Sequence, residues 1–149
     1  MLSLMASLRY RMQPQLREAQ LDLRWLIADE EVLDGVQGTP ARQILRIAQE
    51  ALANAVRHSN ASVVKVICCY SRRDDALRME IADNGVGFQS GQLAVGAGDQ
   101  PSLGKGLVGM HERARKLGGQ LSIGGLRGTG VHVLLRVPME GLRPAPPLL

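Results

Sequence analysis

Residues 49–59 read QEALANAVRHS and lie in the clearest helix that the sequence predicts, residues 41–58. Apolar residues recur there at helical spacing and form one stripe that would face a core. The polar side chains on a neighbouring face of the helix are Glu50, Asn54, Arg57 and His58. A ridge of this kind can hold a hydrated Mg²⁺ and its phosphates, because hard cations prefer oxygen ligands. Taken alone, the segment is explained more simply as the solvated face of an amphipathic helix.

Segments on the N-terminal side of this helix predict a further helix and a strand. Residues 2–20 carry apolar side chains at helical spacing, and Pro14 either kinks that helix or begins a second one. Residues 21–27 alternate in polarity, which indicates a strand. Residues 29–40 are acidic, contain Gly and Pro, and predict a loop.

The C-terminal half of the chain predicts strands around one more helix. In order, the predicted elements are strands at 63–70 and 76–82, a loop at 89–103, a helix at 106–117, and strands at 120–123 and 131–137. A polar turn joins the first two strands into a hairpin, and Gly118-Gly119 ends the helix. Helices packed against a largely antiparallel sheet predict an α+β fold, a two-layer α/β sandwich with the helices on one face.

The length and composition fit one domain. Hydrophobic residues make up 45% of the 149 residues, which is enough for one sizeable core. We predict that the domain spans residues 21–138. A helical segment at 1–20 leads into it, and a Pro-rich flexible tail follows at 139–149.

Charge and composition argue against nucleic acid and membrane as partners. The formal net charge is +4 with the arginines dispersed, and aromatic residues, which could stack on bases, make up only 3%. The apolar run before Arg9 is too short to span a bilayer. Cys68 and Cys69 are adjacent and would point to opposite faces of a strand, so they would rarely pair. A reduced, cytoplasmic chain is the simplest interpretation.

A second candidate site follows the strand at 76–82, where residues 83–88 read DNGVGF. Gly85 and Gly87 allow the backbone to approach a flat ligand closely, and Asp83 can accept a hydrogen bond from an exocyclic amine. A plain Asn-Gly turn would also explain the segment. This turn leads into a loop rather than a paired strand, which favours a site.

Two more glycine-containing segments come later in the chain. Residues 104–110 read GKGLVGM. Glycines at the start of a helix free backbone N–H groups to meet an anion, and Lys105 adds a positive charge. The segment follows a loop, so a dinucleotide-binding motif is disfavoured. The other segment, Gly128-Thr129-Gly130, would alone be an ordinary hairpin turn.

Together, the four segments resemble the nucleotide-binding boxes of the GHKL superfamily, which includes DNA gyrase, the mismatch-repair ATPases and the histidine kinases. Residues 49–59 resemble the N box of the histidine kinases related to the nitrate and lipid-fluidity sensors. Residues 106–113, followed by Leu117-Gly118-Gly119, are similar to the second glycine box and helix of that subfamily. The resemblance covers roughly residues 20–138.

The resemblance implies a Bergerat-type ATP-binding fold and the catalytic domain of a two-component sensor histidine kinase. Such a domain binds Mg-ATP and transfers the γ-phosphoryl group to a histidine on a dimerisation domain. Asn54 would coordinate Mg²⁺, Asp83 would bond the adenine amine, and residues 89–103 would form a lid. The nucleotide-binding residues implied are Asn54, Arg57, His58, Asp83, Gly85, Gly87, Gly104, Lys105, Gly106, Leu107, Val108, Gly109, Met110 and Thr129.

The resemblance leaves the roles of two residues open. Glu50 and Asn54 are the implied catalytic residues, but the Glu matching Glu50 activates water in the ATPases of the superfamily. In the kinases it positions Mg²⁺ or assists the acceptor. His58 would face phosphate, or would simply favour the negative end of the helix dipole. Lys105 stands where relatives often have His.

The histidines of this chain do not match the phosphoacceptor of the subfamily, which lies next to an acidic residue on a long dimerising helix. His58 is in the N box, His132 in a strand and His111 in the helix at 106–117. We therefore expect a catalytic domain from a larger kinase or a stand-alone relative. The expected partners are ATP, the dimerisation helices of the full-length kinase and, indirectly, a response regulator. A cytoplasmic domain is compatible with a parent anchored in the inner membrane.

Two other functions are compatible with the same fold. One is an anti-sigma-type serine kinase, against which the Gly-Met-x-Glu-Arg run at residues 109–113 argues. The other is a regulatory module that binds ATP without catalysis. The presence of Glu50, Asn54 and Asp83 argues against a module that has lost catalysis.

Overall fold

The structure is a computed structural model that describes residues 1–58, 60–87, 101–125, 129–143 and 148, with only the backbone at 101–105. In chain order its elements are α1 (Leu2–Glu18), β1 (Asp22–Ile27), α2 (Glu30–Asp34), α3 (Gly38–His58), β2 (Val63–Ser71), β3 (Ala76–Asp83), α4 (Pro101–Lys116), β4 (Gln120–Gly124), β5 (His132–Pro138) and a short 3₁₀ helix (Met139–Gly141). The five strands form one sheet in the order β1-β2-β3-β5-β4. β1 lies parallel to β2, and the other pairs are antiparallel.

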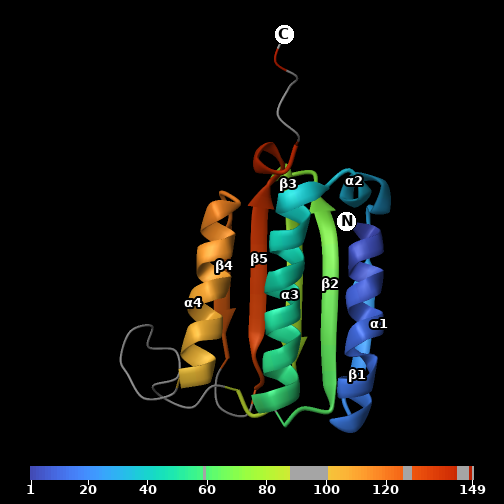
Figure 1. The fold of residues 1–149 in the computed structure, drawn as a ribbon, viewed down its shortest axis with the longest axis vertical. Helices are drawn as coiled ribbons and strands as arrows, with labels where there is room; N and C mark the ends of the chain where they lie inside the picture. The colour runs from blue at the N-terminus through green and yellow to red at the C-terminus, as the bar shows by residue number, and fades with distance from the viewer. Residues whose placement is uncertain (59, 88–100, 126–128, 144–147, 149) are drawn as a thin grey trace.

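The long helices α1, α3 and α4 cover one face of this sheet, with α3 in the middle (Figure 1). The predicted α+β two-layer sandwich with a mixed, mostly antiparallel sheet is therefore confirmed. The predicted hairpin is also confirmed, because β2 and β3 pair in register from Val64↔Asp83 to Ser71↔Ala76. No helix among the residues that the structure describes is long and apolar enough to cross a membrane.

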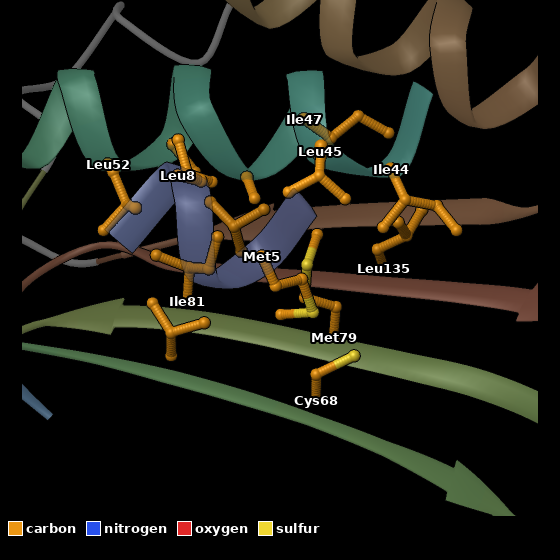
Figure 2. Close-up of a cluster of buried hydrophobic side chains, with 14 of the residues drawn as sticks. Met5, Leu8, Ile44, Leu45, Ile47, Leu52, Cys68, Met79, Ile81 and Leu135 are labelled. Carbon is orange, nitrogen blue, oxygen red and sulfur yellow. The ribbon is translucent and has the colours of Figure 1, made fainter. Parts of the chain in front are cut away.

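An aliphatic core fills the space between the sheet and the helices. Alternate residues of β2, namely Val64, Val66 and Cys68, are fully buried, as the two-residue period of a strand requires. Figure 2 shows strand residues such as Cys68, Met79 and Leu135 meeting side chains of α1 and α3. Burial raises the pKa of the Cys68 thiol to about 12, and Cys69 adds to that rise. The Cys68 side chain therefore stays neutral and packs as a small apolar group.

Helix α1 is part of the same core. Its buried residues are Met5, Leu8, Met12 and Leu16, one stripe at helical spacing. The helix is continuous through Pro14, so a second helix does not begin there. Pro14 cannot donate to the carbonyl of Tyr10, and Tyr10 is exposed, so water can satisfy that carbonyl.

The boundaries of some predicted elements were wrong. The short helix α2 lies within residues 29–40, which the sequence predicted to be a loop. Glu30 and Glu31 in its first turn favour the positive end of the helix, and Leu33 anchors it in the core. Helix α4 begins at Pro101 rather than at Gly106, because proline suits the first turn of a helix. Its predicted end is confirmed: Gly118 adopts φ +67° and the Gly119 amide bonds to the Ala114 carbonyl at 2.9 Å.

Candidate nucleotide-binding site

The four sequence segments singled out above meet at one end of the molecule. The end of α3, the end of β3, the start of α4 and the start of β5 all lie at the lower end in Figure 1. Contacts link these elements in pairs, since α3 packs against both α4 and β3, and β3 pairs with β5. Residues far apart in the chain are therefore brought into one region, as a ligand site requires.

Asp83 lies at the end of β3 with one of its carboxylate oxygens fixed. Its Oδ1 accepts hydrogen bonds from the Gly85 amide at 2.8 Å and the Val131 amide at 3.3 Å. Oδ2 has no hydrogen-bond partner within the part of the chain that the structure describes. The two amides orient the carboxylate and leave Oδ2 as an acceptor for a ligand.

The last glycine segment packs directly on Asp83. A Cβ atom at Gly130 would meet the Asp83 carbonyl oxygen and would lie 2.8 Å from the Asp83 carbonyl carbon. Gly130 also has φ +84°. Only glycine fits both the contact and the backbone angle. Thr129 lies exposed on the turn just before it, and Gly128 is outside the described residues.

Asn84 is a residue that the sequence reasoning did not single out. Its Oδ1 accepts from the Ser62 and Val63 amides at 3.0 and 2.9 Å, and its Nδ2 donates to Ser62 Oγ at 2.9 Å. The side chain therefore ties the loop after β3 to the start of β2. Gly85 and Gly87, beyond it, are buried, and Gly87 has φ +73°. These bonds hold the backbone on which Asp83 is presented.

Asn54 carries a buried acceptor without a partner. Its Oδ1 is inaccessible to solvent and makes no hydrogen bond among the described residues. An unpaired buried acceptor costs about 1–3 kcal/mol, so it calls for a ligand. An amide oxygen is the type of ligand that Mg²⁺ takes, and Mg²⁺ usually adds water and phosphate oxygens to one or two protein ligands. The residue therefore fits the predicted metal position.

The other polar residues of α3 are differently engaged. The Arg57 guanidinium lies 3.6 Å from Glu50 Oε1, and its Nε donates to the Ala53 carbonyl at 3.3 Å. His58 is exposed at the end of the helix. Arg57 thus pairs with Glu50, a contact that the sequence reasoning missed because the two residues are two helical turns apart.

Gly106 connects the second glycine segment to Glu50. A Cβ atom at Gly106 would meet Glu50 Oε1 and would lie 3.0 Å from its Cδ. The absence of a side chain at Gly106 therefore lets the Glu50 side chain lie between α3 and α4.

Helix α4 places the remaining predicted residues in two environments. The side chains of Leu107 and Met110 are buried in the core, whereas Val108 is exposed and Gly109 half-buried. Leu107 and Met110 could thus reach a nucleotide only through their backbone. Only the first turn of a helix has free N–H groups, and that turn contains Gly104. The side chain of Lys105 lies outside the described residues, as do residues 89–100, which are most of the lid predicted at 89–103.

Comparison with known proteins shows which family and which relatives the chain matches. Residues 39–141 match the family described as "Histidine kinase-, DNA gyrase B-, and HSP90-like ATPase". The chain is 33% identical over 123 residues to the sensor histidine kinase LiaS of Bacillus subtilis, a match covering 83% of this chain and 31% of LiaS. It is 35% identical over 126 residues to the signal transduction histidine-protein kinase/phosphatase UhpB of Salmonella typhimurium, covering 80% of this chain and 23% of UhpB. The chain thus spans less than a third of either relative.

A solved structure agrees at the level of the fold. The catalytic domain of the histidine kinase ThkA, in a nucleotide-free form, superposes with a TM-score of 0.73 and 15% sequence identity. The match covers 96% of this chain and 94% of that domain. The two domains therefore share their architecture over almost their whole length.

Proposed function

Because the chain belongs to the family of histidine kinase-, DNA gyrase B- and HSP90-like ATPases, we propose that it is the Mg-ATP-binding catalytic domain of a sensor histidine kinase. In this role it transfers the γ-phosphoryl group of ATP to a histidine on the dimerisation helices of the full-length kinase. The names of LiaS and UhpB, both histidine kinases, support this assignment. The structural observation that carries the proposal is the half-satisfied carboxylate of Asp83.

Asp83 would select adenine. Its Oδ1 is fixed by two backbone amides, so Oδ2 remains to accept a hydrogen bond from the exocyclic amine of adenine. Guanine presents a carbonyl oxygen at the corresponding position, which would face the carboxylate with like polarity. The glycines at 85, 87 and 130 carry no side chains, so the backbone around Asp83 could lie close to the base.

The residues on α3 would hold the metal and the phosphates. Asn54 Oδ1 would be a Mg²⁺ ligand, and the metal, when bound, neutralises charge on the phosphoryl oxygens. Glu50 would position the metal or assist the acceptor histidine. Arg57, His58 and Lys105 would face the phosphates, and amides of the glycine-rich start of α4 would bind their oxygens.

The wider assignment follows the sequence resemblance. We assign the chain to the subfamily related to the nitrate and lipid-fluidity sensors, with residues 21–138 as the ATPase domain. Residues 1–20 would lead into it and add α1 to its core. Residues 139–149 would form a tail, of which Met139 and Leu142 pack against the domain. The partners would be the dimerisation helices and, through them, a response regulator. We place the domain in the cytoplasm.

Titration calorimetry with Mg-ATP and Mg-GTP tests the proposal on the wild type and on Asp83→Asn. The variant keeps an acceptor for the two backbone amides but replaces the free oxygen with a donor that opposes the amine of adenine. We expect the wild type to prefer ATP, and the variant to bind ATP about ten- to a hundredfold more weakly. Affinity for GTP should not fall.

Asp22→Asn provides the matched control, because the Asp22 side chain is 66% exposed on the edge strand. It should bind ATP as the wild type does. Equal affinity of the wild type for ATP and GTP would remove Asp83 from the adenine pocket. Transfer of labelled phosphate to serine instead of histidine in added partner proteins would replace the histidine kinase assignment with that of a serine kinase.

A further inference from the structure

A polar groove crosses the outer side of the helical layer. It measures about 480 Å³ and lies between α1, α3 and α4. Its basic lining residues are Arg46 and Arg57 of α3 and Arg113 of α4, and Glu50 is the acidic one. Met12 and Gln15 of α1 and Gln49, Ala53 and Val56 of α3 complete the lining. The groove therefore combines an excess of positive charge with apolar and amide surface.

Two of the three arginines have no partner among the residues that the structure describes. Arg57 pairs with Glu50 at 3.6 Å. The side chains of Arg46 and Arg113 make neither a hydrogen bond nor an ion pair within the ranges that the structure describes. Guanidinium groups form their strongest contacts with carboxylates and phosphates. The groove thus presents two unpaired cations to an anionic ligand.

The spacing of the arginines indicates an extended ligand. Arg46 and Arg57 lie on one helix about 16 Å apart along its axis, at 1.5 Å per residue. A single phosphate group cannot bridge that length, whereas a helix with acidic residues on successive turns can. The half-buried apolar side chains of Ala53 and Val56 suit the aliphatic side of such a helix.

A nucleic acid fits the same groove less well. Among the residues that the structure describes, no aromatic side chain lines the groove to stack on a base. We therefore propose that this groove, which we call the arginine groove, is a docking site for an acidic amphipathic helix of a partner protein. The inference deepens the proposed function and rests on it only through Glu50 and Arg57, because a helix docked there would lie against both residues.

The probe for this site is a fluorescein-labelled alanine-based peptide. It carries Glu at positions i, i+4, i+7 and i+11 and Leu beside them, so that one face is acidic and apolar. Fluorescence anisotropy with the full chain measures its binding. We expect it to bind the wild type, and to bind Arg46→Glu/Arg113→Glu at least about tenfold more weakly. A peptide of the same composition with its Glu residues spread around the helix should bind more weakly than the probe.

The matched control is Arg72→Glu/Arg73→Glu, which makes the same change of charge in the exposed turn between β2 and β3. It should bind the peptide as the wild type does. Equal binding by the groove variant and the wild type would overturn the proposal. Equal binding of the two peptides, or complete displacement of the probe by inorganic phosphate, would also overturn it. So would a wild type that binds oligothymidine but not the peptide, if the groove variant loses oligothymidine binding.

Urea denaturation and ATP titration separate this inference from the proposed function. The groove variant should unfold at the wild-type midpoint and bind ATP with wild-type affinity. Loss of peptide binding with ATP binding intact supports the docking site. If the wild-type chain binds the peptide but does not bind ATP, the docking site is supported and the proposed nucleotide site is wrong.

Discussion

Asn54 and Asn84 are both polar side chains near the nucleotide end of the molecule, but their surroundings differ. Asn84 makes three side-chain hydrogen bonds that join the loop after β3 to the start of β2. Asn54 has a buried carbonyl oxygen without a partner among the described residues. The first asparagine supports the fold, whereas the second carries a cost that a bound metal would remove.

Alanine at each of these positions should therefore have opposite effects on stability. We expect Asn84→Ala to lower the free energy of unfolding by about 0.5–1.5 kcal/mol, because two exposed backbone amides lose their acceptor to water. Asn54→Ala should leave stability unchanged or raise it by up to about 1 kcal/mol, while Mg²⁺ no longer strengthens ATP binding. Urea unfolding and calorimetry with and without Mg²⁺ measure both effects. A large loss of stability in Asn54→Ala would mean that its side chain supports the fold.

At the scale of the elements, the packing of α4 on α3 depends on one glycine. Gly106 has no space for a Cβ atom because the Glu50 side chain fills it. At Gly109, one turn later, a Cβ atom would meet only the mobile end of Arg113, 2.7 Å from its Nη1. The two glycines of the same helix therefore differ in what a methyl group would displace.

Gly106→Ala should destabilise the domain although alanine is the better helix former. The gain in helix propensity is about 0.5–1 kcal/mol, and forcing the Glu50 side chain away costs about 1–3 kcal/mol. Gly109→Ala, the control, should be neutral or stabilising. A double-mutant cycle with Glu50→Ala measures the coupling in urea unfolding. A coupling free energy of zero between positions 50 and 106 would show that alanine at position 106 does not clash with the Glu50 side chain.

The elements differ in how far the sequence could predict them. The stripe of α3 and the β2–β3 hairpin follow from periodicity and a polar turn, and both were predicted within a few residues. The start of α4 was misplaced because glycines at 104 and 106 suggested a helix mouth. Helix α2 was missed because its five residues are too few for a periodic pattern. Contacts such as Glu50–Gly106 or Asn84–Ser62 arise only when distant segments meet, so no local pattern could show them.

At the scale of the whole molecule, α1 supplies one wall of the core. Its four buried residues, Met5, Leu8, Met12 and Leu16, face the layer that α3 and the sheet form. Burying each such side chain contributes about 1.5–3 kcal/mol, so the four together contribute about 6–12 kcal/mol as an upper estimate. It approaches the whole stability of a typical domain, about 5–15 kcal/mol.

Removal of residues 1–18 should therefore abolish cooperative thermal unfolding, which circular dichroism can follow. A chain that ends at Arg143 is the control, since Leu142 is buried and Arg143 pairs with Asp75. It should melt as the full chain does. If the chain without residues 1–18 melts cooperatively within about 5 °C of the full chain, α1 is an accessory to the core.

The parallel pairing of β1 with β2 also sets an expectation for the order of folding. β2 and β3 are joined by a short turn, whereas α2 and α3 separate β1 from β2 in the chain. Closing the longer loop costs more entropy, so the hairpin should form early and the edge strand should dock late. Val66→Ala should then slow refolding, and Leu23→Ala should mainly speed unfolding, in stopped-flow measurements. The reverse result would make the edge strand part of the folding nucleus.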